Sequence, residues 1–152
     1  MLRRDPGTQG GVVLIEALLG ILIFSIGILA LIGMQSVAVK NTIDARYRTE
    51  AAYLANNVLS QIRLDMANVT LYPDSNTANY APRTTWRTQV EALLPGINIA
   101  SAQRVPSIAI APGPTYGGDT DPPSRVTVIL LWQQPGETQD RRFEIVGYVS
   151  RQ

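Results

Sequence analysis

A single carboxylate, Glu16, stands inside an otherwise apolar run of the sequence. From Val12 to Met34, 18 of 23 residues are apolar, and Glu16 is the only charged one. A charge at the centre of a bilayer costs about 2.5 to 3.5 kcal/mol, and less near the interface, so such an acid is expected to have a partner. Cutting the chain just before the apolar run creates a new amino terminus, and this amine is the nearby cation available to Glu16. A protonated or snorkelling Glu16 at the membrane boundary is the alternative.

The segment that carries Glu16 is long enough to cross a membrane. Ala17 to Val39 contains 23 residues without a charge. As a helix it spans roughly 34 Å, against a hydrocarbon core of about 30 Å. The rest of the chain is too small to enclose such a helix on all sides, which disfavours a buried core helix. A secretory signal peptide is also disfavoured, because its apolar region is shorter and its small residues follow that region.

Composition excludes several classes of chemistry. The chain has 152 residues, no His, no Cys and a formal charge of +1. It therefore has no thiolate nucleophile, no imidazole base, no zinc site built from these residues and no disulfide. The charge is too low to follow nucleic-acid phosphates. We expect no enzyme, no cofactor, no metal site and no nucleic-acid partner.

The helix is expected to continue beyond the span, because after Pro6 the next proline is Pro73. We expect one helix from about Val12 to about Ala67. Its second half is amphipathic, and its apolar positions recur at steps of three and four residues. The expected core-facing residues are Ile43, Tyr47, Ala51, Leu54, Ala55, Val58, Ile62 and Met66.

Two loops and a small antiparallel sheet are expected after this helix. The stretches Tyr72 to Thr85 and Ala111 to Ser124 have loop composition, and Thr85 is the expected cap of a short helix through Leu94. The strongest strand pair is Arg125 to Gln133 with Arg141 to Arg151. Weaker strands are expected at Ile97 to Ala100 and Ile108 to Ile110. The inward faces are Val126, Val128, Leu130 and Trp132 on the first strand of the pair, and Phe143, Ile145 and Val149 on the second.

Other polar and aromatic residues give weaker signals. Asp119 and Asp121, in a Gly-rich loop, have oxygen ligands suited to calcium, although a polar turn is the more common meaning. Glu91 and Asp140 have no partner placed by sequence for acid–base chemistry. Trp86 and Trp132 are expected in the core.

The N-terminal residues Gly11-Val12-Val13-Leu14-Ile15-Glu16 resemble the type III signal of type IV pilins and pseudopilins. The resemblance implies that prepilin peptidase cuts after Gly11 and methylates the new terminal residue, Val12. It implies that Glu16, five residues into the mature chain, neutralises the amino terminus of a neighbouring subunit. Val12 replaces the usual Phe or Met, and Gly33 stands where many major pilins have proline.

Downstream residues are similar to one subgroup, the minor pilins of the PilV type, called type IV pilus modification proteins. The similarity lies in 25-SIGILALIGMQ-35, 53-YLA-55 and 61-QIR-63, and more loosely in Trp86, Leu94-Pro95-Gly96 and Trp132. The resemblance implies an α+β pilin fold: a long N-terminal helix, transmembrane in its first half, packed on a small antiparallel sheet. It also implies a leader at residues 1–11, a transmembrane and fibre-core segment at 12–39, and a periplasmic domain at 40–152.

The implied function is structural, in priming or modifying the pilus and so affecting piliation, twitching motility and adhesion. The implied partners are prepilin peptidase, the major pilin, other minor pilins and the inner-membrane assembly platform. The implied location is the inner membrane, with a single span, and then the fibre or its tip. Two alternatives stay open: a minor pseudopilin of a type II secretion system, and a membrane-anchored adhesin that never polymerises.

Overall fold

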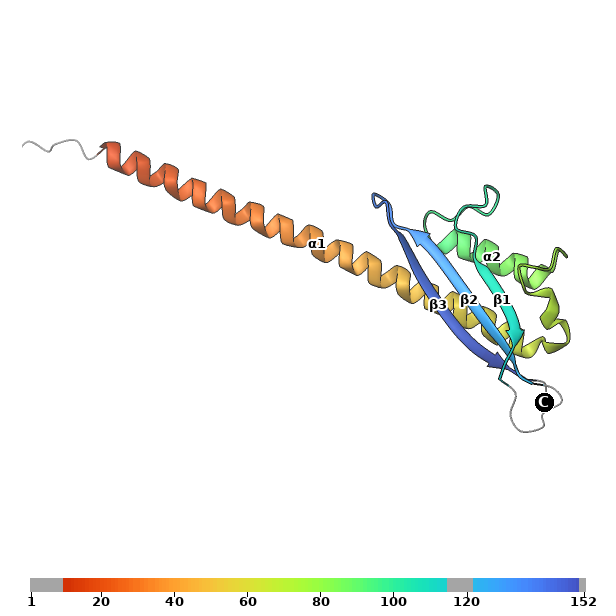
Figure 1. Cartoon of the computed structure of the whole chain (residues 1–152). Helices are drawn as coiled ribbons and strands as arrows, with labels where there is room; N and C mark the ends of the chain where they lie inside the picture. Colours follow the sequence, from red (N-terminus) through yellow and green to blue (C-terminus); the bar gives the residue numbers. More distant parts are fainter. Residues whose placement is uncertain (1–9, 115–121, 151–152) are drawn as a thin grey trace, which may run out of the picture. The chain divides into compact units, whose positions relative to one another are not determined.

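The computed structural model describes residues 10–114 and 122–150 of the chain. The order of elements is α1 (Gly10–Leu64), η1 (Met66–Leu71), α2 (Ala81–Leu93), β1 (Ser107–Pro112), β2 (Ser124–Gln133) and β3 (Asp140–Val149) (Figure 1). The fold is α+β, with one long apolar N-terminal helix and a three-stranded antiparallel sheet, as the sequence predicted in outline. The chain forms two compact units, which meet in sequence between Ile43 and Asp44. We call residues 10–43 the apolar segment and residues 44–150 the head.

Helix α1 runs through both units without a break in its secondary structure. The absence of proline between Pro6 and Pro73 permits this length. The α-helix ends at Leu64, three residues earlier than expected, and the chain tightens into the 3-10 helix η1. Asn68 has non-helical backbone angles inside η1, which marks a kink there.

The sheet has the order β1-β2-β3, and both neighbouring pairs are antiparallel. Val128 at the centre of β2 pairs with Ile108 on β1 and with Ile145 on β3. The β2–β3 hairpin closes through Pro135 and Gly136, where Gly136 has a φ of 82° and the Glu137 N–H donates to the Gln134 carbonyl at 3.1 Å. Proline followed by a residue of positive φ is the signature of a type II turn, and the predicted hairpin is confirmed.

The core of the head lies between the C-terminal half of α1, helix α2 and one face of the sheet (Figure 1). The predicted inward face of β2 is fully buried, and Phe143, Ile145 and Val149 of β3 pack against the same cluster. The predicted stripe of α1 is confirmed from Tyr47 onward. The core residues of α1 are Tyr47, Ala51, Leu54, Ala55, Val58, Leu59 and Ile62, and the predicted Met66 packs against the core from η1.

Two positions on α1 differ from the prediction. Ile43 is exposed, because it lies before the first residue of the head. Leu59 is buried although it stood outside the predicted stripe. It packs against Gly147 of β3, where a Cβ would come within 2.5 Å of the Leu59 side chain. The missing side chain at Gly147 therefore lets α1 approach β3 closely enough to bury an extra leucine.

Helix α2 begins earlier than predicted, so the expected cap at Thr85 and the expected loop as far as Thr85 are wrong. The N-cap is Tyr80, and Pro82 occupies the first turn. Proline suits this position because the first helical N–H groups have no partner in the helix. Trp86 of α2 is fully buried as predicted, and its indole N–H donates to the Leu54 carbonyl of α1 at 2.9 Å.

The weak strand expected at residues 97–100 is also wrong. A single bridge joins Asn98 to Gln103, and the chain turns between them. Residues 99 and 100 belong to this turn, and so does Ala102, which has a φ of 57°. Glu91 of α2 stabilises this turn, because its carboxylate accepts the Ile99 N–H at 3.1 Å.

Candidate functional site

The residues expected to act in processing and assembly lie at the start of α1. Helix α1 begins at Gly10, so Gly11 and Val12 belong to its first turn and Glu16 to its second. Val12 and Glu16 are separated by one helical turn and occupy the same side of the helix. The three residues on which the signal depends, Gly11, Val12 and Glu16, are all exposed. The structure describes no residue of the expected leader before Gly10.

Glu16 has no ion-pair partner within residues 10–114 and 122–150. Its neighbours on the helix are aliphatic, so a membrane or a packed fibre would leave its carboxylate unsolvated. A partner cation for Glu16 must therefore come from outside the described residues or from another molecule.

The apolar segment exposes large aliphatic side chains on every side. Leu19, Leu31 and Ile32 are 54%, 60% and 56% exposed, and at about 100° per residue they lie at widely separated angles around the helix. By length and composition this helix is sufficient to cross a membrane. Its Ser25 hydroxyl donates to the Ile21 carbonyl at 2.7 Å, so that polar group is satisfied inside the helix.

At the first residue of the head, one carboxylate ties α1 to the β2–β3 hairpin. Asp44 accepts a hydrogen bond from the Gln134 amide at 2.7 Å and one from Arg48 at 2.9 Å. Arg141 of β3 lies 3.6 Å from the same carboxylate. Gln134 is nearly fully buried, so this contact satisfies a polar group that would otherwise be costly to bury.

A second carboxylate joins the end of α1 to the start of α2. Asp65 accepts hydrogen bonds from the Tyr80 hydroxyl, from the Asn68 amide at 2.8 Å and from the Tyr72 hydroxyl at 3.2 Å. These bonds, led by that from Tyr80, lower the pKa of Asp65, while burial raises the pKa of Tyr72. The two tyrosine rings meet edge to face, 5.1 Å apart. We call these four residues the Asp65 cluster.

A buried arginine organises the loop before α2. The Arg83 guanidinium donates to the Pro73 carbonyl at 2.7 Å, to the Asn76 carbonyl at 2.8 Å and to the Ala78 carbonyl. A charged side chain is expensive to bury unless its donors are satisfied, and three carbonyls satisfy most of them here. Arg83 therefore fixes this loop through its two terminal nitrogens.

The carboxylates considered for catalysis have structural partners. Glu91 accepts the Ile99 N–H, and Asp140 pairs with Arg104 at 2.7 Å. Within the described ranges no three acidic or other ligating side chains gather into a metal site. The predicted calcium ligands Asp119 and Asp121 lie outside the described residues.

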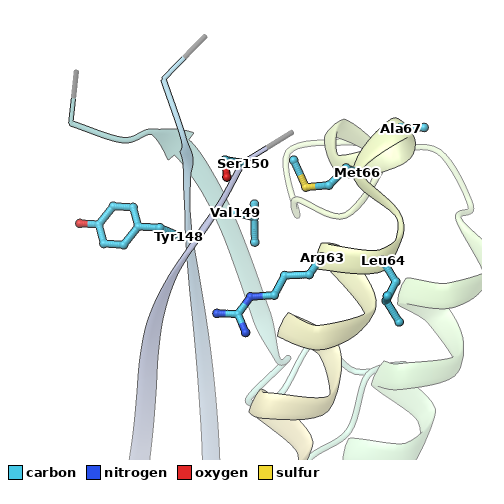
Figure 2. Close-up of a pocket in the computed structure, with 7 residues that line it drawn as sticks. All are labelled: Arg63, Leu64, Met66, Ala67, Tyr148, Val149 and Ser150. Carbon is cyan, nitrogen blue, oxygen red and sulfur yellow. The ribbon is translucent and has the colours of Figure 1, made fainter. Parts of the chain in front are cut away.

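One hollow of the head lies where α1 and β3 end. It has a volume of about 870 Å³, and Figure 2 shows Arg63 reaching from the helix toward the strand beside Val149. Tyr148 points to the other side of β3 in the same view. The lining mixes one cation with aliphatic and hydroxyl groups, and it contains no general base or nucleophile arranged for catalysis.

Sequence reasoning missed the Asp65 cluster and Arg83. No local pattern joins Asp65 to Tyr80, which is 15 residues away, because the contact depends on the fold of the loop between them. Pro82 was the one available signal, since proline in a first helical turn would have placed the start of α2 next to Tyr80.

Comparison with protein-family models, with curated proteins and with solved structures finds no match.

Proposed function

We propose that this chain is a minor pilin that is processed by prepilin peptidase and helps to initiate or modify a type IV pilus. The observation that carries the proposal is Glu16. It is a lone carboxylate in an exposed apolar helix, five residues after Gly11, and no described residue neutralises it. Cleavage after Gly11 creates an amine at Val12, and the amine of a neighbouring subunit is a suitable partner.

The exposure of the apolar segment supports a helix that is covered first by lipid and later by other helices. A single isolated helix cannot bury aliphatic groups that point in all directions. Lipid covers them while the chain is held in the inner membrane, and the helices of other pilins cover them in the fibre. The pilin fold, the periplasmic location of the head and the pilin partners are parts of the same proposal.

N-terminal sequencing of the membrane-extracted chain is the first test. The proposal expects a chain that begins at a methylated Val12. An intact leader overturns it and favours the membrane-anchored adhesin that never polymerises.

The second test replaces Glu16 by alanine in the full-length chain and measures its amount in sheared fibres. We expect normal processing and membrane insertion, with incorporation reduced roughly tenfold or more, because a hydrogen bond to a charged group contributes about 1.5 to 3 kcal/mol. Glu16→Asp, which keeps the charge, is expected to retain part of the incorporation. Ser25→Ala is the matched control, since the Ser25 hydroxyl bonds only within its own helix. Normal incorporation of Glu16→Ala would show that the carboxylate does not recruit the subunit.

Deletion of the gene separates the pilus from a type II secretion system. Loss of fibres and of twitching, with normal export of hydrolases, is expected. The reverse result assigns the chain to the secretion pseudopilins.

A further inference from the structure

The outer edge of β1 is blocked at two of its three outward-facing residues, Ile108 and Pro112. The Ile108 N–H donates to the Asp74 carboxylate at 3.1 Å, and the Asp74 N–H donates to the Ile108 carbonyl at 3.0 Å. The strand ends at Pro112, which has no N–H to offer. A capped residue and a proline are devices that prevent further strands from pairing with an edge.

The bonds of Ile108 also reveal which groups of β3 point outward. The Ile108 N–H and C=O bind Asp74, so they point away from β2, and the pair formed by Ile108 and Val128 is not hydrogen-bonded. The backbone groups of Val128 therefore point toward β3, where its partner is Ile145. Hydrogen-bonded and open positions alternate along an antiparallel strand. Ile145 thus faces β2, and its neighbours Glu144 and Val146 face the outside.

The outer edge of β3 is open. Its outward-facing residues have no backbone or side-chain hydrogen bond to their main-chain groups within the part of the chain that the structure describes, and the strand contains no proline. These residues are Asp140, Arg142, Glu144, Val146 and Tyr148. We call this row of main-chain groups the β3 edge. A ten-residue strand is about 33 Å long, which is enough for a full partner strand.

We propose that the β3 edge binds an extended strand of a different pilin-like subunit, so that the sheet of the head continues into a neighbour. This inference rests on the proposed function, because the choice of partner assumes that the α1 helices of neighbouring subunits run in the same direction. A second copy of this chain is excluded in two ways. First, Asp74 caps Ile108 and Pro112 has no N–H, so head-to-tail pairing at the β1 edge is limited to the outward groups of Ile110.

Pairing of two β3 edges fails for a geometric reason. Two copies that pair through their β3 edges are related by a twofold axis. If the pleats of the two strands are to match, this axis makes the strands run antiparallel. The same rotation reverses the direction of α1, whose C-terminal half packs on the sheet. Two subunits anchored in one membrane, or assembled in one fibre, have their helices in the same direction. The partner strand must therefore come from a different chain, one whose open strand can pair with β3 while its helix runs in the same direction as α1.

The side chains along the β3 edge describe the partner strand. Arg142 and Glu144 form an ion pair at 2.6 Å at one end, and Val146 and Tyr148 are 42% and 51% exposed at the other. Side chains of outward-facing residues share one face of a strand, and partners directly opposite interact. The strand that fits is polar or charged opposite Arg142 and Glu144 and apolar opposite Val146 and Tyr148.

The test replaces Val146 by proline in the full-length chain in its own cell. Proline at this position removes one outward N–H and leaves the bonds between β3 and β2, so the head keeps its fold. Val146→Ala is the matched control, because it shortens the side chain and keeps the N–H. We expect equal membrane levels and melting temperatures within a few degrees, but roughly tenfold less Val146→Pro in sheared fibres, because the partner strand loses a hydrogen bond and meets the ring.

A second measurement is independent of the proline. A photo-crosslinking amino acid is placed at Tyr148 on the open edge, and at the exposed Ala109 of β1 as the control. We expect an adduct from position 148 with a pilin-like subunit of the fibre, and at least fivefold less from position 109. An adduct mainly with the chain itself, or equal incorporation of both Val146 variants, overturns the edge proposal. Absence of the unsubstituted chain from fibres overturns the proposed function instead, and the edge proposal with it.

Discussion

The two halves of helix α1 have the same secondary structure and opposite surroundings. In the apolar segment, large side chains such as Leu29 are exposed, whereas Leu54 and Val58 in the head are buried almost completely. Helix formation alone does not distinguish these residues, because the backbone hydrogen bonds are the same. The difference shows that the head is stable through its own core, while the apolar segment depends on what surrounds it. Matched substitutions in the two halves test this contrast.

The largest expected effect comes from Leu54→Ala. The Leu54 side chain is buried in the core of the head, and its truncation leaves a cavity that costs about 2 to 5 kcal/mol of unfolding free energy. Leu29→Ala is the matched control, with no change expected in the unfolding of the head. Urea unfolding of the detergent-solubilised chain, followed by tryptophan fluorescence, measures both. Equal effects of the two substitutions would contradict the contrast between the halves.

Glycine substitutions sharpen the same contrast at a smaller scale. Gly147→Val forces a side chain into the space of Leu59 and is expected to cost about 1 to 3 kcal/mol. Gly20→Ala meets no atom within 4 Å and is expected to leave the head unchanged while favouring the helix. Thermal melts by circular dichroism compare them. A stable Gly147→Val variant would show that α1 does not need its close approach to β3.

The smallest expected effect is a dependence on pH at the end of α1. Hydrogen bonds led by that from Tyr80 hold the pKa of Asp65 below its ordinary value of 3.8. A carboxyl with a lowered folded pKa contributes stability above its unfolded pKa, and that contribution is lost as the pH falls through the folded value. We expect the unfolding free energy of the wild type to fall more steeply below about pH 4 than that of Asp65→Asn.

Tyr80→Phe provides the control for this pH effect. It keeps the ring that packs on Tyr72 and removes the hydroxyl that donates to Asp65. The slope of stability against pH is expected to fall partway toward that of Asp65→Asn. Identical slopes in the wild type and both variants would show that Asp65 contributes nothing to acid sensitivity.

Local patterns predicted the parts of the fold that depend on periodicity. The alternation in β2 placed Val126, Val128, Leu130 and Trp132 on one face, and all four are buried. The prediction failed where a distant contact decides, as at Leu59, which is buried because Gly147 of β3 lacks a side chain. The start of α2 was misplaced because Thr85 has the chemistry of a cap, whereas the loop held by Arg83 ends at Tyr80.

The candidate residues divide in the same way. Gly11, Val12 and Glu16 lie within two turns of one helix, so the sequence alone fixes their spacing. The Asp65 cluster joins residues from separate elements, and the open state of the β3 edge depends on the order of the strands in the sheet, so no short pattern records either of them.

The sequence by itself determined that an uncharged helix long enough for a membrane carries one acid near its start, because composition and a rise per residue are local properties. It also determined which faces of α1 and β2 are apolar. Only the tertiary structure decided which edge of the sheet stays open. That outcome depends on Asp74 reaching Ile108 across 34 residues of chain, and a contact of this kind exists only once the loop, the helix and the sheet have packed together.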